Sequence, residues 1–379
     1  MKILHTSDLH IGKRINEYSM YDEQEFILKQ ITDIAKSELP DAIILAGDIY
    51  DKSVPSAEAV SLFDDFLANL AELGKSIFII SGNHDSAERI AFASRILQSS
   101  NIYLSPVYNG KIFPIILNDG KTDVAFYMIP FIKPITVQHF AEEGIELKSY
   151  NDAYRHIIHQ LDIDKSRRNI LITHQFITGA RRTESEDIIV GGLDNIDASI
   201  FSDFDYVALG HLHSPQHCGK ETIRYSGTPL KYSFSEVDDK KSVTIIEIHG
   251  QEEPVISERV LVPIHDWHDL KGTYEMLTAK SFYDGTDYQE SFIRITLTDE
   301  EEIPDGMRKL KSIYHRLLEL RYDNKRTRAG MTLIGKPMNV NTIKPDEIFS
   351  ELFEKQNAQP LSSEQQDYLN NIIETIFNK

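Results

Sequence analysis

Side chains that can bind a metal ion stand at the ends of five separate apolar runs in this sequence. These runs stop at Asp8 with His10, Asp48, Asn83 with His84, His174, and His211 with His213. Aspartate and asparagine often end strands because they favour turns, so a single such residue would carry little information. Five in one domain carry more, because the carboxyl ends of parallel strands meet at one edge of a sheet. The pattern predicts a metal site.

The last of these runs, "VALGHLH", shows how little one motif decides. His211 and His213 are two residues apart, and in an extended chain this spacing puts both imidazoles on the same side. Taken alone, they fit either a pair of ligands or two polar residues in a surface loop. Metal binding by these two histidines is favoured only because the other four apolar runs also end at residues that can bind a metal ion.

The types of these residues indicate the class of metal and the chemistry. Asp, Asn and His without cysteine suit divalent ions such as Mn²⁺, Fe²⁺ or Zn²⁺. Seven ligands exceed the needs of one ion, so we expect two ions sharing a carboxylate, with Asp48 as the candidate bridge. His84 directly follows Asn83, so its side chain should point elsewhere, towards a phosphate or a leaving oxygen.

Alternating strands and helices must position these residues. Strands are expected over Lys2–Thr6, Asp41–Ala46, Ser76–Ser81, Lys111–Leu117, Asp123–Ile129, Asn169–Thr173, Tyr206–Leu209, Thr222–Ser226, Val243–Ile248 and Val255–Val262. Helices are expected over Glu23–Lys36, between Pro55 and Gly74, and over Ser86–Leu97 and Asn151–Leu161. This order predicts a layered α/β sandwich.

The pattern changes after Pro263. Strands Ser291–Leu297 and Leu317–Tyr322 flank a helix over Asp305–His315, which predicts a small β-α-β domain. We expect a linker over Lys325–Asn341. Two acidic amphipathic helices then follow, over Asp346–Glu354 and Glu364–Phe377.

Composition restricts the class of protein. The 379 residues carry a formal net charge of −19, which argues against nucleic-acid binding through the overall field. No stretch of the sequence is apolar over the length that a membrane span needs, and no signal peptide is visible. The single cysteine, Cys218, excludes an internal disulfide and favours a reducing cytoplasm.

Five motifs together resemble those of the calcineurin-like metallophosphoesterases. They read "SDLH" from Ser7, "GDIYD" from Gly47, "GNHD" from Gly82, "THQ" from Thr173 and "GHLH" from Gly210. The longer stretches "HTSDLHIGKR", "GDIYDKSVPS" and "YSGTPLKYSFSE" resemble one branch in particular, the SbcD subunits of bacterial SbcC–SbcD DNA nucleases.

This resemblance implies a fold and a set of roles. The fold would be a four-layer α/β/β/α sandwich over residues 1–264, with a small α+β DNA-capping domain over 265–337 and a linker with C-terminal helices over 338–379. One ion would be held by Asp8, His10, Asp48 and His213, and the second by Asp48, Asn83, His174 and His211. His84 would be catalytic, and the metal would be Mn²⁺.

The resemblance also implies an activity and partners. It predicts a DNA nuclease with 3′–5′ exonuclease activity on double strands and endonuclease activity on single strands and hairpins. The subunit would form a homodimer within a heterotetramer, and the C-terminal helices would bind the SbcC ATPase. This sequence has no phosphate-binding loop of its own, so any ATP dependence would come from the SbcC ATPase.

Candidate DNA contacts lie in two regions. Lys13, Arg14, Arg181 and Arg182 follow the metal motifs, and Arg308, Lys309 and Lys311 belong to a basic segment, Ile303–Pro337. Two alternatives stay open. One is another dimetal phosphoesterase, such as a protein phosphatase or nucleotide phosphodiesterase, for which this basic segment would be unnecessary. The other is a non-catalytic DNA tether, which the intact ligand set and His84 argue against.

Overall fold

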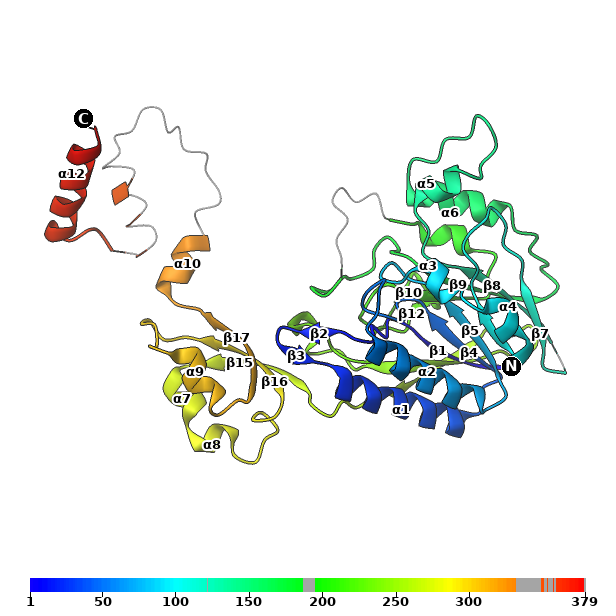
Figure 1. Ribbon diagram of the computed structural model, residues 1–379, viewed down its shortest axis with the longest axis horizontal. Helices are drawn as coiled ribbons and strands as arrows, with labels where there is room; N and C mark the ends of the chain where they lie inside the picture. Colours follow the sequence, from blue (N-terminus) through cyan, green and yellow to red (C-terminus); the bar gives the residue numbers. More distant parts are fainter. Residues whose placement is uncertain are drawn as a thin grey trace. The chain divides into compact units, whose positions relative to one another are not determined.

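The computed structural model describes residues 1–120, 122–186, 195–331, 349–350, 353, 357 and 359–377 (Figure 1). The chain forms two compact units, Met1–Ile264 and His265–Lys379. Among the described residues, no helix is long and apolar enough to cross a membrane. Most of the helix expected over Asp346–Glu354, and the linker beyond Met331, lie outside the described residues.

The first unit contains two six-stranded sheets. The first sheet has the order β14 (Val255–Val260), β13 (Ser242–Glu247), β1 (Lys2–Thr6), β4 (Ala42–Ala46), β5 (Ser76–Ile80) and β6 (Ile102–Leu104). The second has the order β11 (Gln216–Cys218), β12 (Lys220–Tyr225), β10 (Tyr206–Gly210), β9 (Arg168–His174), β8 (Asp123–Ile129) and β7 (Ile115–Asn118). In the first sheet β1, β4 and β5 run parallel to one another, and in the second sheet β9 and β10 do. The carboxyl ends of the strands that precede the metal motifs therefore lie at one edge of each sheet.

The two sheets pack face to face through an apolar core. Ile44 and Phe78 from the first sheet meet Phe126, Ile170 and Ala208 from the second, and all five side chains are buried. Every residue of β4 is buried, so both faces of this strand are covered. These apolar runs without alternation are what a sheet covered on both sides requires.

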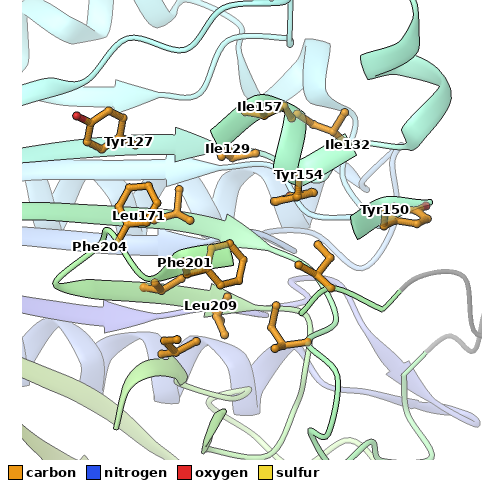
Figure 2. Packing of buried hydrophobic residues seen from close by; sticks show 14 of the residues in the cluster. Tyr127, Ile129, Ile132, Tyr150, Tyr154, Ile157, Leu171, Phe201, Phe204 and Leu209 are labelled. Atoms are coloured by element: carbon orange, nitrogen blue, oxygen red, sulfur yellow. The ribbon is translucent and has the colours of Figure 1, made fainter. Parts of the chain in front are cut away.

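Helices cover the outer faces. Figure 1 shows α1 (Tyr21–Glu38) and α2 (Ala57–Ala71) beside the first sheet. On the second sheet, α6 (Tyr150–His159) places Tyr154 and Ile157 in one cluster with Leu171 and Leu209 (Figure 2). The short helices α5 (Pro134–Gln138) and η2 (Ala198–Phe201) lie near this cluster. The four-layer α/β/β/α sandwich is therefore confirmed.

Two expected elements of this unit were wrong in extent. The helix expected over Ser86–Leu97 is two short helices, α3 (Ala87–Ile90) and α4 (Ser94–Leu97), because Ala93 is left-handed at φ 61° and interrupts the helical hydrogen bonds. The strand expected over Lys111–Leu117 begins only at Ile115, since Pro114 has no N–H to donate. The remaining small elements are β2 (Arg14–Ile15), β3 (Tyr18–Ser19), η1 (Gln98–Ser100) and η3 (Phe234–Glu236).

The second unit contains a three-stranded parallel sheet with the order β15 (Trp267–Gly272), β16 (Phe292–Leu297) and β17 (Arg316–Tyr322). Its helices are α7 (Tyr274–Thr278), α8 (Lys280–Tyr283), α9 (Gly306–Lys311), α10 (Lys325–Met331) and α12 (Ser363–Phe377). The expected β-α-β order is present, although α9 is shorter than predicted and β15 was not recognised.

The helix α10 corrects the linker expected from Lys325 onwards. Asn324 caps this helix, because its Oδ1 accepts the Thr327 N–H at 3.0 Å and its carbonyl accepts the Arg328 N–H at 3.0 Å. The functional roles assigned to 265–337 and 338–379 stay predictions.

Candidate metal centre

The loops that follow β1 and β4 hold one another through their backbones. The N–H of Asp8 donates to the Gly47 carbonyl at 2.9 Å, and the N–H of His10 donates to the Asp48 carbonyl at 3.0 Å. Asp8, His10 and Asp48 all have left-handed backbones, with φ of 53°, 47° and 49°. Such conformations cost free energy for residues other than glycine and concentrate at functional sites. The turns aim several side chains at one point.

Two glycines allow the strand ends to approach this closely. A Cβ at Gly82 would lie 2.1 Å from Oδ1 of Asp48, and one at Gly210 would lie 1.9 Å from the Ala46 carbonyl oxygen. No side chain fits at either position without moving the backbone. The glycines of the GNHD and GHLH motifs are therefore required by close packing at the site.

One group of potential ligands consists of Asp8, His10 and His213, whose ligand atoms lie within 4.8 Å of one another. Nε2 of His10 lies 3.1 Å from Nε2 of His213. Nε2 of His10 also lies 3.7 Å from Oδ2 of Asp48. The structure brings together all four residues expected around the first ion.

The second group surrounds the same carboxylate. Oδ2 of Asp48 lies 3.3 Å from Nε2 of His174, and Oδ1 of Asn83 lies 2.9 Å from that nitrogen and 3.0 Å from Nδ1 of His211. Nδ1 of His174 faces the Ala46 carbonyl at 2.9 Å and donates to it, which directs Nε2 towards the cluster. Because Asp48 contacts both groups, its position is that of a bridge.

Burial and neighbouring charges shift the pKa values of the acids and histidines at this site. Burial raises the pKa of Asp8 to about 6, whereas at Asp48 the effect of burial is outweighed by His174 and His10, which hold the pKa of this carboxyl below its usual range. At His174 burial is likewise outweighed, and Asp48 raises the pKa to about 9. Burial lowers the pKa of His211 to about 3 and that of His10 well below its usual range.

These shifts fit a donor set built for cations. His10 and His211 are neutral at pH 7, so each has a nitrogen lone pair to offer. The charge of the Asp48 carboxylate is balanced by a proton on His174, and a divalent ion would replace that proton. The residue types and their burial therefore fit two divalent ions held by Asp, Asn and His side chains.

His84 lies beside the two groups in a defined orientation. Its N–H donates to Oδ1 of Asp48 at 2.9 Å, and Nδ1 lies 3.0 Å from the Asp51 carbonyl oxygen, to which it donates. The ring is edge-on to that of His10, with centroids 4.8 Å apart. Asp51 therefore orients the proposed catalytic histidine, a role that was not predicted although Asp51 ends the GDIYD motif.

A second set of residues that were not predicted surrounds His213. Ser185 lies 2.6 Å from Nδ1 of His213, Glu186 accepts the His213 N–H at 2.7 Å, and Lys241 donates to the His213 carbonyl at 2.9 Å. Glu236, in the YSFSE stretch, accepts from both Ser185 and Lys241. Nothing in the local pattern of Ser185 or Lys241 indicates these contacts, which form only on folding.

The basic residues expected near the metals have diverse surroundings. Nζ of Lys13 lies 2.8 Å from Oδ1 of Asp51, and Arg14 donates to the Glu17 carbonyl at 2.6 Å. Arg181 pairs with Asp239 at 2.8 Å, and the guanidinium of Arg182 lies 3.7 Å from the ring centre of Phe176. Lys13 is thus linked through Asp51 to His84.

In the second unit, Arg308, Lys309 and Lys311 all lie on α9, where Arg308 and Lys309 are exposed. Arg308 pairs with Asp305 at 3.1 Å. Several other basic residues of this segment have acidic partners: Arg316 with Glu290, Arg321 with Glu319, Arg326 with Glu302 and Arg328 with Asp323. Exposure of Arg308 and Lys309, rather than a lack of partners, therefore marks α9 within the expected basic segment.

Comparison with known proteins agrees with this geometry. Residues 1–215 match the calcineurin-like phosphoesterase family, and residues 262–357 match a family described as the type 5 capsule protein repressor C-terminal domain. The SbcD component of the SbcCD nuclease of Staphylococcus epidermidis is 34% identical over 84% of this chain and 85% of its own length. Its counterpart in Staphylococcus saprophyticus is 32% identical over 84% of each chain.

Among solved structures, a dimetal phosphatase from Danio rerio aligns with 69% of this chain and 96% of its own, with a TM-score of 0.41 and 12% identity. The family match and the two staphylococcal relatives decide the assignment without this weaker similarity. The chain belongs to the calcineurin-like phosphoesterases and, within them, to the SbcD family of nuclease subunits, and it is a metal-dependent phosphodiesterase.

Proposed function

We propose that this chain is the nuclease subunit of an SbcC–SbcD complex and hydrolyses DNA phosphodiester bonds with two divalent ions, preferably Mn²⁺. The observation that carries the proposal is the position of Asp48, whose Oδ2 lies 3.7 Å from His10 and 3.3 Å from His174. A carboxylate shared by two ligand groups is what a two-ion phosphoesterase needs.

The ligand assignment follows from the two groups. One ion would be held by Asp8, His10, Asp48 and His213, and the other by Asp48, Asn83, His174 and His211. When bound, such ions supply an activated water and offset the charge that develops on the phosphate. The residues of the chain fix the positions at which this chemistry takes place.

His84 is proposed to act on the leaving oxygen. With Nδ1 donating to the Asp51 carbonyl, Nε2 is the ring nitrogen available to hold a proton for transfer. His84 also shares Asp48 with the ligand groups through its N–H. These contacts support a role in protonating the leaving group or in stabilising the phosphate.

The finer activities and partners are also part of the proposal. The relatives are components of nucleases named SbcCD, which supports a complex with an SbcC ATPase and DNA. We propose exonuclease action in the 3′–5′ direction on duplexes, endonuclease action on single strands and hairpins, a homodimer of this chain and a cytoplasmic location. The C-terminal helices would contact the ATPase, which an apolar groove lined by Phe349, Phe353, Tyr368 and Ile372 supports.

A direct experiment compares the unmodified protein with Asp48→Ala on labelled duplex and hairpin DNA in Mn²⁺, with and without the SbcC ATPase. Asp64→Ala, which removes an exposed carboxylate on α2, is the matched control. We expect cleavage by the unmodified and Asp64→Ala proteins and almost none by Asp48→Ala. Absence of DNA cleavage by the unmodified protein under every condition, with retained hydrolysis of a small phosphodiester, would favour a nucleotide phosphodiesterase instead.

A further inference from the structure

The buried ion pair between Glu236 and Lys241 lies next to His213, with Oε1 of Glu236 3.8 Å from Nδ1 of this histidine. Nζ of Lys241 lies 2.6 Å from Oε2 of Glu236, and the two side chains are 3% and 0% exposed. A buried pair of this kind costs desolvation free energy and is weak evidence for stability by itself. Its hydrogen bonds indicate what else it does.

Lys241 holds the backbone of His213. Its ammonium group donates to the His213 carbonyl at 2.9 Å, to Oγ1 of Thr228 at 2.9 Å and to Glu236, so all three N–H bonds have acceptors. Glu186 accepts the N–H of His213 at 2.7 Å. Both backbone polar groups of this histidine are therefore fixed by side chains from other segments.

Glu236 reaches the imidazole through a hydroxyl. Oγ of Ser185 lies 2.6 Å from Oε1 of Glu236 and 2.6 Å from Nδ1 of His213. Both oxygens of Glu236 face donors, because Oε2 accepts from the Lys241 ammonium group at 2.6 Å and Oε1 accepts from Oγ of Ser233 at 2.8 Å and from the Tyr232 N–H at 3.4 Å. Glu236 is therefore a carboxylate, which can only accept hydrogen bonds.

Because Glu236 can only accept, the donor and the acceptor are fixed in both hydrogen bonds of Ser185, the one to Glu236 and the one to His213. Ser185 must give its single hydroxyl proton to Glu236, so its lone pairs are left to accept from His213. Nδ1 of His213 therefore carries the proton, and Nε2 carries the lone pair. Nε2 is the atom that lies 3.1 Å from Nε2 of His10, in the group with Asp8.

We infer that Ser185 and Glu236, anchored by Lys241, are positioning residues that fix the tautomer and orientation of His213 as a metal ligand. The inference rests on the proposed two-ion function and goes beyond it by assigning residues outside the ligand set. Ser185 lies in the chain between β9 and β10, close in sequence to Arg181 and Arg182, so the contact links this part of the chain to the ion expected at His213.

Ser185→Ala tests the inference, and Ser233→Ala is its matched control. Oγ of Ser233 donates to the same Oε1 of Glu236 at 2.8 Å, and the two substitutions therefore remove one hydroxyl each from the same carboxylate oxygen. Of the two hydroxyls, that of Ser185 is the one in contact with His213. The probe is Mn²⁺ alone, titrated into metal-free protein while the free ion is followed by electron paramagnetic resonance.

We expect the unmodified protein and Ser233→Ala to bind two Mn²⁺ with similar affinities. Ser185→Ala should bind one ion normally and the other about 10- to 100-fold more weakly, the usual loss when a residue that orients a ligand is removed. Both substitutions remove a hydrogen bond to Oε1 of Glu236, so the loss of that bond does not explain a difference in metal affinity between the two variants.

Two results would contradict the inference alone, and a third would contradict the proposed two-ion function as well. Two tightly bound ions in Ser185→Ala would overturn the inference and leave the proposed function intact. Equal weakening in Ser233→Ala would also overturn it, because the effect would then come from the general packing around Glu236. An unmodified protein that binds no pair of Mn²⁺ ions would overturn the two-ion function, and the inference with it.

Discussion

Nε2 of His10 faces Nε2 of His213 at a distance of 3.1 Å, and the side chains are 1% and 2% exposed. His10 is neutral because burial lowers its pKa well below the usual range, and the Ser185 contact leaves the lone pair of His213 on Nε2. Two buried imidazole nitrogens at this distance must share a proton or a cation, and a divalent ion would take the place of the proton. The close approach of His10 and His213 therefore predicts that a bound metal ion stabilises the folded protein.

Addition of Mn²⁺ to protein stripped with a chelator should raise the melting temperature. At a concentration 100 times the dissociation constant, each ion that binds only the folded state adds about 2.7 kcal/mol to the free energy of unfolding. Differential scanning calorimetry checks this. Asp48→Ala, which removes the shared ligand, should lose most of the increase, and an equal increase in that variant would contradict the assignment.

The grouping of the seven proposed ligands followed from the sequence because they stand at or just after the ends of apolar strands, and parallel strands bring their ends together. Local chain geometry was enough in those cases, and Asp8, Asp48 and His174 lie where the motifs placed them. The partners of His213 were missed for the opposite reason. Ser185 and Lys241 are remote from it in sequence, and only the tertiary fold brings them within hydrogen-bonding distance.

His211 and His213 should serve different ions although one residue separates them. His211 lies 3.0 Å from Asn83, whereas His213 lies with Asp8 and His10. We expect His211→Ala and His213→Ala each to retain one tight Mn²⁺ site, and the double variant to retain none, as counted by equilibrium dialysis.

The control for this prediction is His211→Ala combined with Asn83→Ala. These two residues would hold the same ion, so the combination should resemble His211→Ala alone and keep one tight site. A combined variant that binds no Mn²⁺ tightly, or a double histidine variant that still binds one, would refute the division of the ligands.

His84→Gln should reduce kcat and leave metal binding unchanged. His84 contacts Asp48 through its backbone N–H, which the substitution keeps, while the imidazole that would transfer a proton is removed. General acid catalysis contributes about 10²- to 10⁴-fold to rates, so a loss in kcat of that order is expected. Steady-state hydrolysis of a small phosphodiester with a good leaving group provides the contrast, since such a substrate needs little protonation and should lose less. Equal losses on both substrates would argue against the role in protonation.

Gly82→Ala should damage both stability and metal binding. The new Cβ would lie 2.1 Å from Oδ1 and 2.4 Å from the backbone nitrogen of Asp48, so the strand ends must separate. Overpacking of this kind costs about 1–3 kcal/mol. Urea denaturation measures the loss, with Gly306→Ala as the control, because a Cβ there would meet its nearest atoms at 3.4 Å. Unchanged unfolding and unchanged Mn²⁺ affinity in Gly82→Ala would show that the loops do not need this close approach.

The charges of α9 should affect DNA binding and not the chemical step. Arg308, Lys309 and Lys311 lie on one short helix, and two of them are exposed. Replacement of all three by alanine should weaken binding to duplex DNA. It should also make the dependence of log affinity on log salt concentration less steep by about 0.9 for each DNA phosphate that is no longer neutralised. Fluorescence anisotropy over a series of salt concentrations measures the slope.

Lys280→Ala, which removes an exposed charge from α8 in the same unit, should leave the slope unchanged. Hydrolysis of a small phosphodiester should be equal in all three proteins, and a slope that α9 does not influence would remove this helix from the DNA-binding surface.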